Sequence, residues 1–169
     1  ETTPVRYWRR EPERPFLLSE RPFVTLLIGG LSQRHLQLLQ AVGRSLDYRV
    51  QILSTPTKED YQIGREFGDN GMCNPVYFNA GALVRYLQRL RDVEGLSTKQ
   101  IIHGYVVVLP GSCGPCRFGM YEAEYRLILR NAGFAGFRVI VFEQRNFDQG
   151  REEMGLELSA RTPPPVFCA

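Results

Sequence analysis

Short apolar runs alternate with helical repeats along most of this chain of 169 residues. Four such runs, bounded by glycine, proline or polar residues, lie at 23–28, 49–53, 105–109 and 137–142. Strands that are buried on both faces carry continuous apolar runs of this kind, whereas half-exposed strands alternate. Strands separated by helices favour parallel pairing with right-handed crossovers. We therefore expect an α/β fold: a three-layer Rossmann-like domain with a mostly parallel sheet of about four strands.

The segments between these runs predict the helices. The first helix should follow Ser32, a residue suited to the N-cap, and its apolar face should consist of Leu31, His35, Leu38, Leu39, Val42 and Leu46. Further helices are expected at 74 to about 93, 98 to about 102 and 117 to about 132, from their caps and apolar spacing. Residues 57–72 are predicted to be a loop that contains a short helix near 61–67.

Both ends of the chain lack this periodicity. Residues 1–22 mix arginine, glutamate and proline, which predicts an N-terminal arm or linker. Residues 146–169 are weakly patterned, contain three consecutive prolines and include Cys168, which predicts a C-terminal tail. The α/β domain is therefore expected at 23–145, a length that suits one domain.

Three cysteines precede predicted helices. Cys113 and Cys116 lie where the third apolar run turns into a helix, and Cys73 directly precedes the helix that starts at 74. Free N–H groups and the helix dipole favour negative charge at such positions, and thiolates are negative. Because sites in parallel sheets form at the carboxyl ends of the strands, we expect all three sulfurs on one rim. Arg117, next to Cys116, is the best candidate to offset their charge.

The chemistry of these thiols has three interpretations. They could be ligands of an iron–sulfur cluster or of zinc, because thiolates are soft ligands. The segment C-G-P-C at 113–116 is also the active-site tetrapeptide of thioredoxin-like proteins, in which Cys113 would attack a disulfide and Cys116 would resolve it. Against this, most of the α/β pattern precedes the motif, whereas a thioredoxin fold needs an antiparallel half after it. Inert cysteines are the third interpretation.

The net charge and the hydropathy of the chain indicate which kinds of partner and which compartment to expect. The formal net charge is only +3, with nineteen arginines and two lysines, which gives little support to a nucleic-acid partner. Some arginines around the rim could bind the phosphates of an acyl-CoA. No run is long and apolar enough to span a bilayer, and no signal peptide is visible. We therefore expect a cytoplasmic protein with reduced thiols and no membrane contact.

Several motifs taken together resemble one family. They are residues 68–78, which contain C-N-P at 73–75, the stretch 83–87, the motif C-G-P-C-R-F-G-M-Y-E at 113–122, and residues 133–139. In this order and spacing they are similar to the 2-hydroxyglutaryl-CoA dehydratase-related proteins, which are found alone or fused to the acyl-CoA dehydratase activase ATPase. The resemblance covers about residues 23–145.

This resemblance implies an oxygen-sensitive four-iron four-sulfur cluster in the cleft of Rossmann-like domains. In characterised relatives an ATP-driven activator injects one electron, and a radical route then removes water from a 2-hydroxyacyl-CoA. Carried over by motif, Cys73, Cys113 and Cys116 are the implied ligands. An aerobic preparation could hold zinc or nothing instead. The implied partners are an activator ATPase or other domains of the same protein, an acyl-CoA, and a second copy in a homodimer.

The expected function is therefore that of an iron–sulfur module in a 2-hydroxyacyl-CoA dehydratase-like lyase, or in a related ATP-driven low-potential reductase system. Relatives are longer and build the site between domains, so we expect no activity from this chain alone. The alternatives are a thiol–disulfide oxidoreductase that uses Cys113 and Cys116, and a zinc-binding interaction domain.

Overall fold

A four-stranded parallel sheet forms the centre of the computed structural model, which describes residues 14–111 and 116–142. The strands run in the order β2-β1-β3-β4, and each neighbouring pair is parallel. Their bounds are Thr25–Ile28 for β1, Arg49–Ile52 for β2, Tyr105–Pro110 for β3 and Arg138–Phe142 for β4. The predicted α/β class and the four parallel strands are confirmed.

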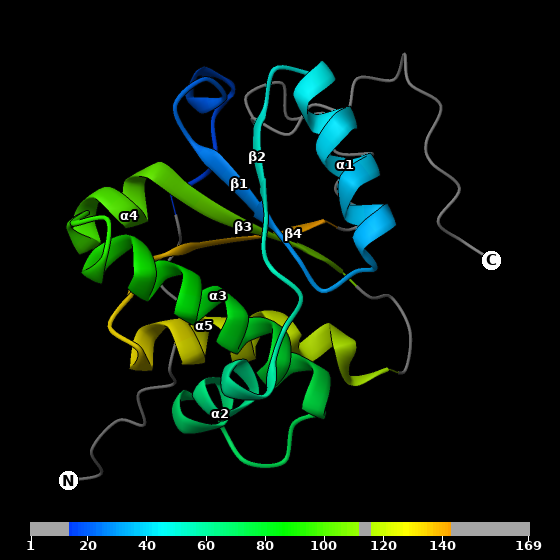
Figure 1. Ribbon diagram of the computed structural model, residues 1–169, viewed down its shortest axis with the longest axis vertical. Coiled ribbons are helices and arrows are strands. Elements are labelled where there is room, and N and C mark those ends of the chain that lie inside the picture. The colour runs from blue at the N-terminus through cyan, green and yellow to red at the C-terminus, as the bar shows by residue number, and fades with distance from the viewer. Residues whose placement is uncertain (1–13, 112–115, 143–169) are drawn as a thin grey trace, which may run out of the picture.

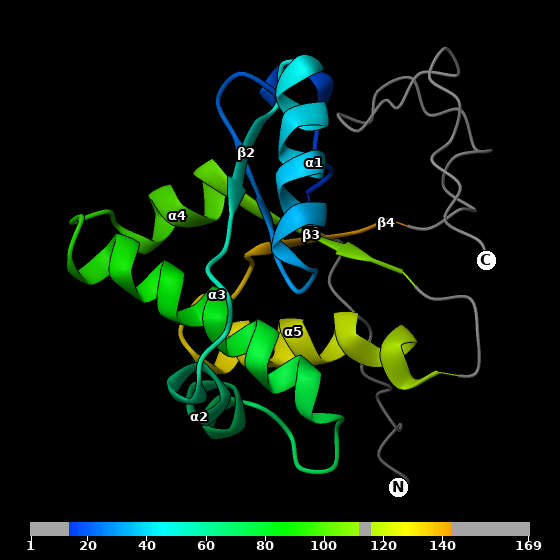
Figure 2. The same cartoon turned by 45° about the vertical axis from the view of Figure 1, so that its right-hand side comes forward.

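Helices cover both faces of this sheet (Figure 1). Helix α1 connects β1 to β2 on one face, whereas α3 and α5 pack against each other on the opposite face (Figure 2). This is the predicted three-layer arrangement. The helix bounds are Gln33–Ser45 for α1, Lys58–Phe67 for α2, Asn74–Asp92 for α3, Thr98–Gly104 for α4 and Tyr121–Asn131 for α5, with 3-10 turns η1 at Leu18–Glu20 and η2 at Arg117–Met120.

Successive side chains of each strand point to opposite faces of the sheet. Leu27 of β1 and Val107 of β3 join the larger core, which α3 and α5 complete. Leu26 and Val106 point to the other face and join a smaller core that includes Phe16. Phe16 belongs to the predicted N-terminal arm, so part of that arm packs onto the domain. Residues 1–13 and the predicted tail lie outside the described residues.

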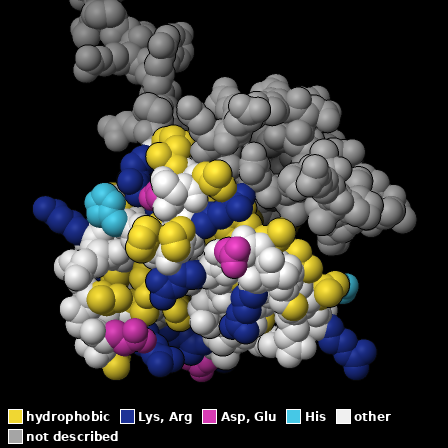
Figure 3. All heavy atoms as spheres, turned by 90° about the horizontal axis from the view of Figure 1, so that it is seen from above, with side chains coloured by type: hydrophobic (Ala, Val, Ile, Leu, Met, Phe, Trp, Pro, Cys, Tyr) yellow, Lys and Arg dark blue, Asp and Glu magenta, His cyan; other side chains and the backbone are white. Residues whose placement is uncertain are grey.

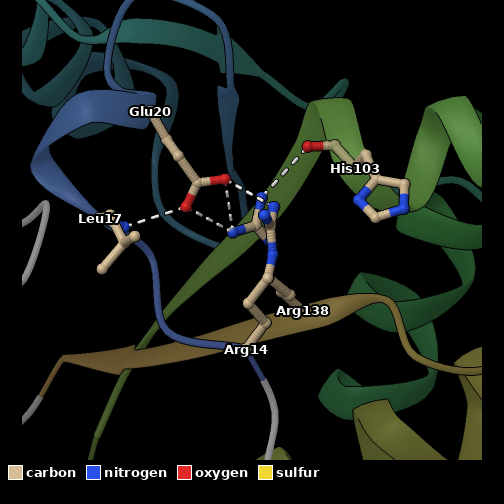
Figure 4. Close-up of polar contacts among 5 residues, drawn as sticks. All are labelled: Arg14, Leu17, Glu20, His103 and Arg138. Carbon is tan, nitrogen blue, oxygen red and sulfur yellow. Dashed lines mark hydrogen bonds and ion pairs between the residues drawn. The ribbon is translucent and has the colours of Figure 1, made fainter.

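An ion-pair cluster fixes this N-terminal segment to β4 (Figure 4). Arg138 is only 4% exposed and donates from Nη1 to both carboxylate oxygens of Glu20, at 3.2 and 3.1 Å, and from Nη2 to the His103 carbonyl at 3.2 Å. Burial alone would raise the pKa of Glu20, but the Leu17 N–H, the Arg138 guanidinium and the charge of Arg14 outweigh it and lower the pKa. The segment before β1 is therefore tied to the far edge strand.

Helix α1 buries a different face from the predicted one. Leu36 is the buried residue of this helix, and a Cβ at Gly43 would lie 2.5 Å from Cγ2 of Val50, so the helix approaches β2 closely there. Gln40 extends the same stripe, because its Nε2 donates to the Val50 carbonyl at 2.9 Å. The predicted apolar face was wrong for four of its residues, which are exposed: Leu38 at 62%, Leu31 and Val42 at 44%, and His35.

Two other predictions needed correction. The region 57–72 contains a full helix, α2, rather than a short one, and it begins with a capping box in which Asp60 accepts the N–H of Thr57 at 2.7 Å. The helix predicted at 117–132 is divided into η2 and α5. Gly119 lies inside η2, and a glycine disfavours a continuous α-helix at that point.

Candidate functional site

A cleft lies at the carboxyl ends of β1, β3 and β4. Its walls are the turn after β1, the end of β3, Val141 of β4, Asn79 of α3, and η2 with the first half of α5, and it is open to solvent. The chain leaves β1 toward β2 on one side of the sheet and leaves β3 toward β4 on the other. Loops diverge at such a switch point between adjacent strands, and a ligand crevice forms there.

The turn after β1 packs directly against α3 in the wall of this cleft. Gly30 has a φ of +80°, and a Cβ at this position would lie 2.9 Å from Nδ2 of Asn79. This backbone conformation is one that L side chains rarely adopt, so glycine is favoured here. A ligand in the cleft would therefore meet bare backbone on one side and the Asn79 amide beside it.

Cys73 and Cys116 occupy equivalent positions in two helices. Cys73 is the N-cap of α3 with φ −66° and ψ 139°, and Cys116 is the N-cap of η2 with φ −69° and ψ 139°. Neither side chain makes a capping hydrogen bond, and both thiols are free of disulfides. Cys73 is half-buried and Cys116 is exposed. Each cysteine therefore directly precedes a helical segment, which is α3 for Cys73 and η2 followed by α5 for Cys116, and the start of a helical segment favours a negative group.

Two observations connect these cysteines. Arg117, which follows Cys116, donates from Nη1 to the carbonyl of Gly71 at 3.1 Å, two residues before Cys73. The pKa of Tyr121 is raised, first by burial and then by the negative charge of Cys73 and Cys116 as thiolates. Tyr121 also lines the cleft. The structure thus brings the segments of Cys73 and Cys116 together beside the cleft.

Of the other predicted site residues, Cys113 lies outside the described residues. Arg117 is exposed, and its side chain contacts the Gly71 carbonyl. Within residues 14–111 and 116–142, no group of three or more His, Cys, Asp or Glu side chains could hold a metal ion. Two of the three predicted cysteine ligands, Cys73 and Cys116, therefore lie in the described part of the chain. Thiolates are ligands of zinc and of iron–sulfur clusters.

Two residues of this region, Tyr121 and Glu124, were not among the predicted site residues. Glu124 is 6% exposed and accepts the N–H of Asp69 at 2.8 Å. An acidic residue in the first turn of a helix ordinarily interacts with the helix dipole at the surface. The partner of Glu124 is a backbone group of a distant loop, and no sequence spacing reveals such a contact.

The arginines are distributed over the surface rather than concentrated at one place on the face that Figure 3 shows. On the face drawn in Figure 3, lysine and arginine side chains are dispersed among hydrophobic and neutral ones rather than gathered in one patch. Several of the described arginines have specific partners: Arg138 pairs with Glu20 and donates to the His103 carbonyl, and Arg117 donates to the Gly71 carbonyl. The individual contacts of the arginines therefore say more about their roles than the net charge does.

No helix in the described ranges is both long enough and apolar enough to cross a bilayer. No protein-family model, no curated protein and no solved structure matches this chain.

Proposed function

We propose that this chain is an iron–sulfur-cluster-binding module of a 2-hydroxyacyl-CoA dehydratase-like system, or of a related ATP-driven low-potential reductase. The observation that carries the proposal is the pair of thiols at two helix starts, Cys73 and Cys116, beside a cleft at the switch point of the sheet. The C-N-P and C-G-P-C-R-F-G-M-Y-E motifs, which contain these residues, support it through the family resemblance.

The cysteines of this site are of the chemical type that binds an iron–sulfur cluster. Cys73 and Cys116, together with Cys113, would hold a four-iron four-sulfur cluster through their thiolates. The N–H groups at the two helix starts and the charge of Arg117 would offset the negative charge of the thiolates. When bound, the cluster supplies one-electron chemistry at low potential.

The cleft residues would bind the substrate beside the thiolates. Tyr121 lines the cleft, and its phenol, which is protonated at neutral pH, can donate a hydrogen bond toward the cleft. The Asn79 amide and the backbone at Gly30 offer further polar groups. In this proposal the ligand is an acyl-CoA, and an activator ATPase or other domains of the same protein complete the site. Free thiols at the site agree with a cytoplasmic location.

Anaerobic reconstitution of the full chain with iron and sulfide tests this proposal. Iron and acid-labile sulfide should reach about four per chain or per dimer, with the visible absorption of thiolate-bound iron. Cys73→Ser, Cys113→Ser and Cys116→Ser should each lower the cluster content, whereas Cys168→Ser in the predicted tail is the matched control and should keep it.

Two results would refute the proposal. The first is a folded wild-type chain that takes up no iron but reduces insulin disulfides in a manner that depends on Cys113 and Cys116, which is the behaviour of a thiol–disulfide oxidoreductase. The second is a tetrahedral zinc that the chain retains and requires for folding, which is the behaviour of a structural zinc domain.

A further inference from the structure

The loop that leads into Cys73 is held from inside by a tyrosine. Tyr77, in the second turn of α3, is completely buried, and its hydroxyl donates to the carbonyl of Asp69. The same hydroxyl accepts the N–H of Met72 at 3.0 Å. One side chain thus satisfies two backbone groups at opposite ends of the loop, and the conformation of the residues before Cys73 is fixed relative to α3.

The same loop is also held from α5, the helix that follows Cys116 and η2. The buried carboxylate of Glu124 accepts the N–H of Asp69 at 2.8 Å. The approach is close, because a Cβ at Gly68 would lie 2.7 Å from Oε1 of Glu124 and 2.6 Å from the carbonyl oxygen of Gly64. A charged acceptor makes a stronger hydrogen bond than a neutral one, and burial protects it from competition with water.

Two more contacts run between the same two parts of the chain. Arg117 donates to the carbonyl of Gly71 at 3.1 Å, and Asn131 at the end of α5 donates from Nδ2 to the carbonyl of Phe67 at 2.8 Å. Both of these side chains are exposed, whereas Glu124 is buried. The segment that carries Cys116 therefore contacts the loop before Cys73 at two points and the end of α2 at a third, and Glu124 makes the one contact of these three that is shielded from solvent.

We infer that Glu124 is a positioning residue, which sets the location of Cys73 relative to Cys116 by holding the backbone N–H of Asp69. The inference rests on the proposed function, because the spacing of two sulfurs matters to a group that both of them bind. Groups outside the ligand shell that orient the ligands of a metal commonly change its affinity by about 10- to 100-fold when they are removed.

Cobalt titration of the full chain is the experiment, since thiolate-bound Co²⁺ absorbs visibly and needs no sulfide. Glu124→Ala should raise the Kd for Co²⁺ about tenfold or more, and Glu124→Gln, which keeps an acceptor oxygen without the charge, should raise it less. Glu20→Ala is the matched control. Glu20 also accepts a backbone N–H, from Leu17 at 3.0 Å, but it pairs with Arg138 and lies outside the cysteine segments.

Hydrogen exchange of the same variants gives a readout that does not depend on metal. Glu124→Ala should speed the exchange of the Asp69 amide at least about tenfold and leave the amides of β1 unchanged. The inference is overturned if folded Glu124→Ala keeps the wild-type cobalt affinity, if Glu20→Ala weakens cobalt binding equally, or if Asp69 exchange does not change. A wild-type chain that binds no cobalt through its thiols contradicts the proposed function, and the exchange result then decides the role of Glu124 alone.

Discussion

Gly81→Ala tests how closely α2 and α3 pack. The two helices touch through their backbones: a Cβ at Gly81 would overlap the carbonyl oxygen of Asp60 and lie 2.9 Å from the nitrogen of Gly64. The contact is reciprocal, since a Cβ at Gly64 would overlap the carbonyl oxygen of Tyr77. Backbone atoms cannot move aside by a change of rotamer, so one helix must shift relative to the other.

The expected magnitude follows from three contributions. Alanine is favoured over glycine inside a helix by about 1 kcal/mol, which stabilises the variant. Overpacking of a close contact costs about 1–3 kcal/mol, and a backbone contact belongs at the upper end. A shift of α2 also disturbs the pair between the fully buried Asp60 and Arg85, which are 2.6 Å apart. We expect Gly81→Ala to lower the free energy of unfolding by about 2 kcal/mol or more.

Urea unfolding of the full chain measures this change, with Gly104→Ala as the matched control. Gly104 is also helical, at the end of α4, but a Cβ at this position would meet no atom within 4 Å, and its φ is not positive. Its substitution should leave the free energy of unfolding within about 1 kcal/mol of wild type. If Gly81→Ala unfolds at the same urea concentration as Gly104→Ala, with the same slope, the close packing described here is refuted.

Two further predictions concern the other face and edge of the sheet. Because the pKa of Glu20 is lowered in the folded state, its contribution to stability is complete above its unfolded pKa and disappears as the pH falls through the folded value. Glu20→Gln should therefore lose less stability than wild type between neutral pH and about pH 3, and equal losses in urea midpoints would contradict the Arg138 pairing. On α1, Leu36→Ala should cost about 3 kcal/mol and Leu38→Ala less than about 0.5, so similar losses would contradict the observed helix orientation.

The strands were predictable because buried parallel strands require continuous apolar runs. Each predicted run overlaps its strand, and the bounds differ by at most two residues. The orientation of α1 was not predictable in the same way. This helix contains more apolar residues than its contact with β2 can bury, and Gly43 and Gln40 make part of that contact. Neither residue contributes to an apolar pattern, so periodicity indicated the wrong face.

Part of the candidate site could likewise be predicted from the sequence, and part of it could not. The helix starts at Cys73 and near Cys116 follow from local sequence, since Pro75 favours the first turn of a helix and the C-x-x-C segment follows an apolar run. The role of Glu124 was not predicted because its partner is the N–H of Asp69. A backbone N–H is present in every residue except proline, so it gives no signal in the sequence. A contact of this kind leaves no trace in residue type at the donating loop.

Gly68, in contrast, does reflect the contact with Glu124 in its residue type. Three groups crowd the space that its side chain would occupy, from α2, from Tyr77 and from Glu124, so the loop can pass between the helices only without a Cβ. The close packing of α2 on α3 at Gly64 and Gly81 brings the end of α2 to this point. The position of Cys73 therefore depends on glycines several turns away as well as on its own helix. A substitution that separates α2 from α3 should move the thiol even though it touches no residue of the cleft.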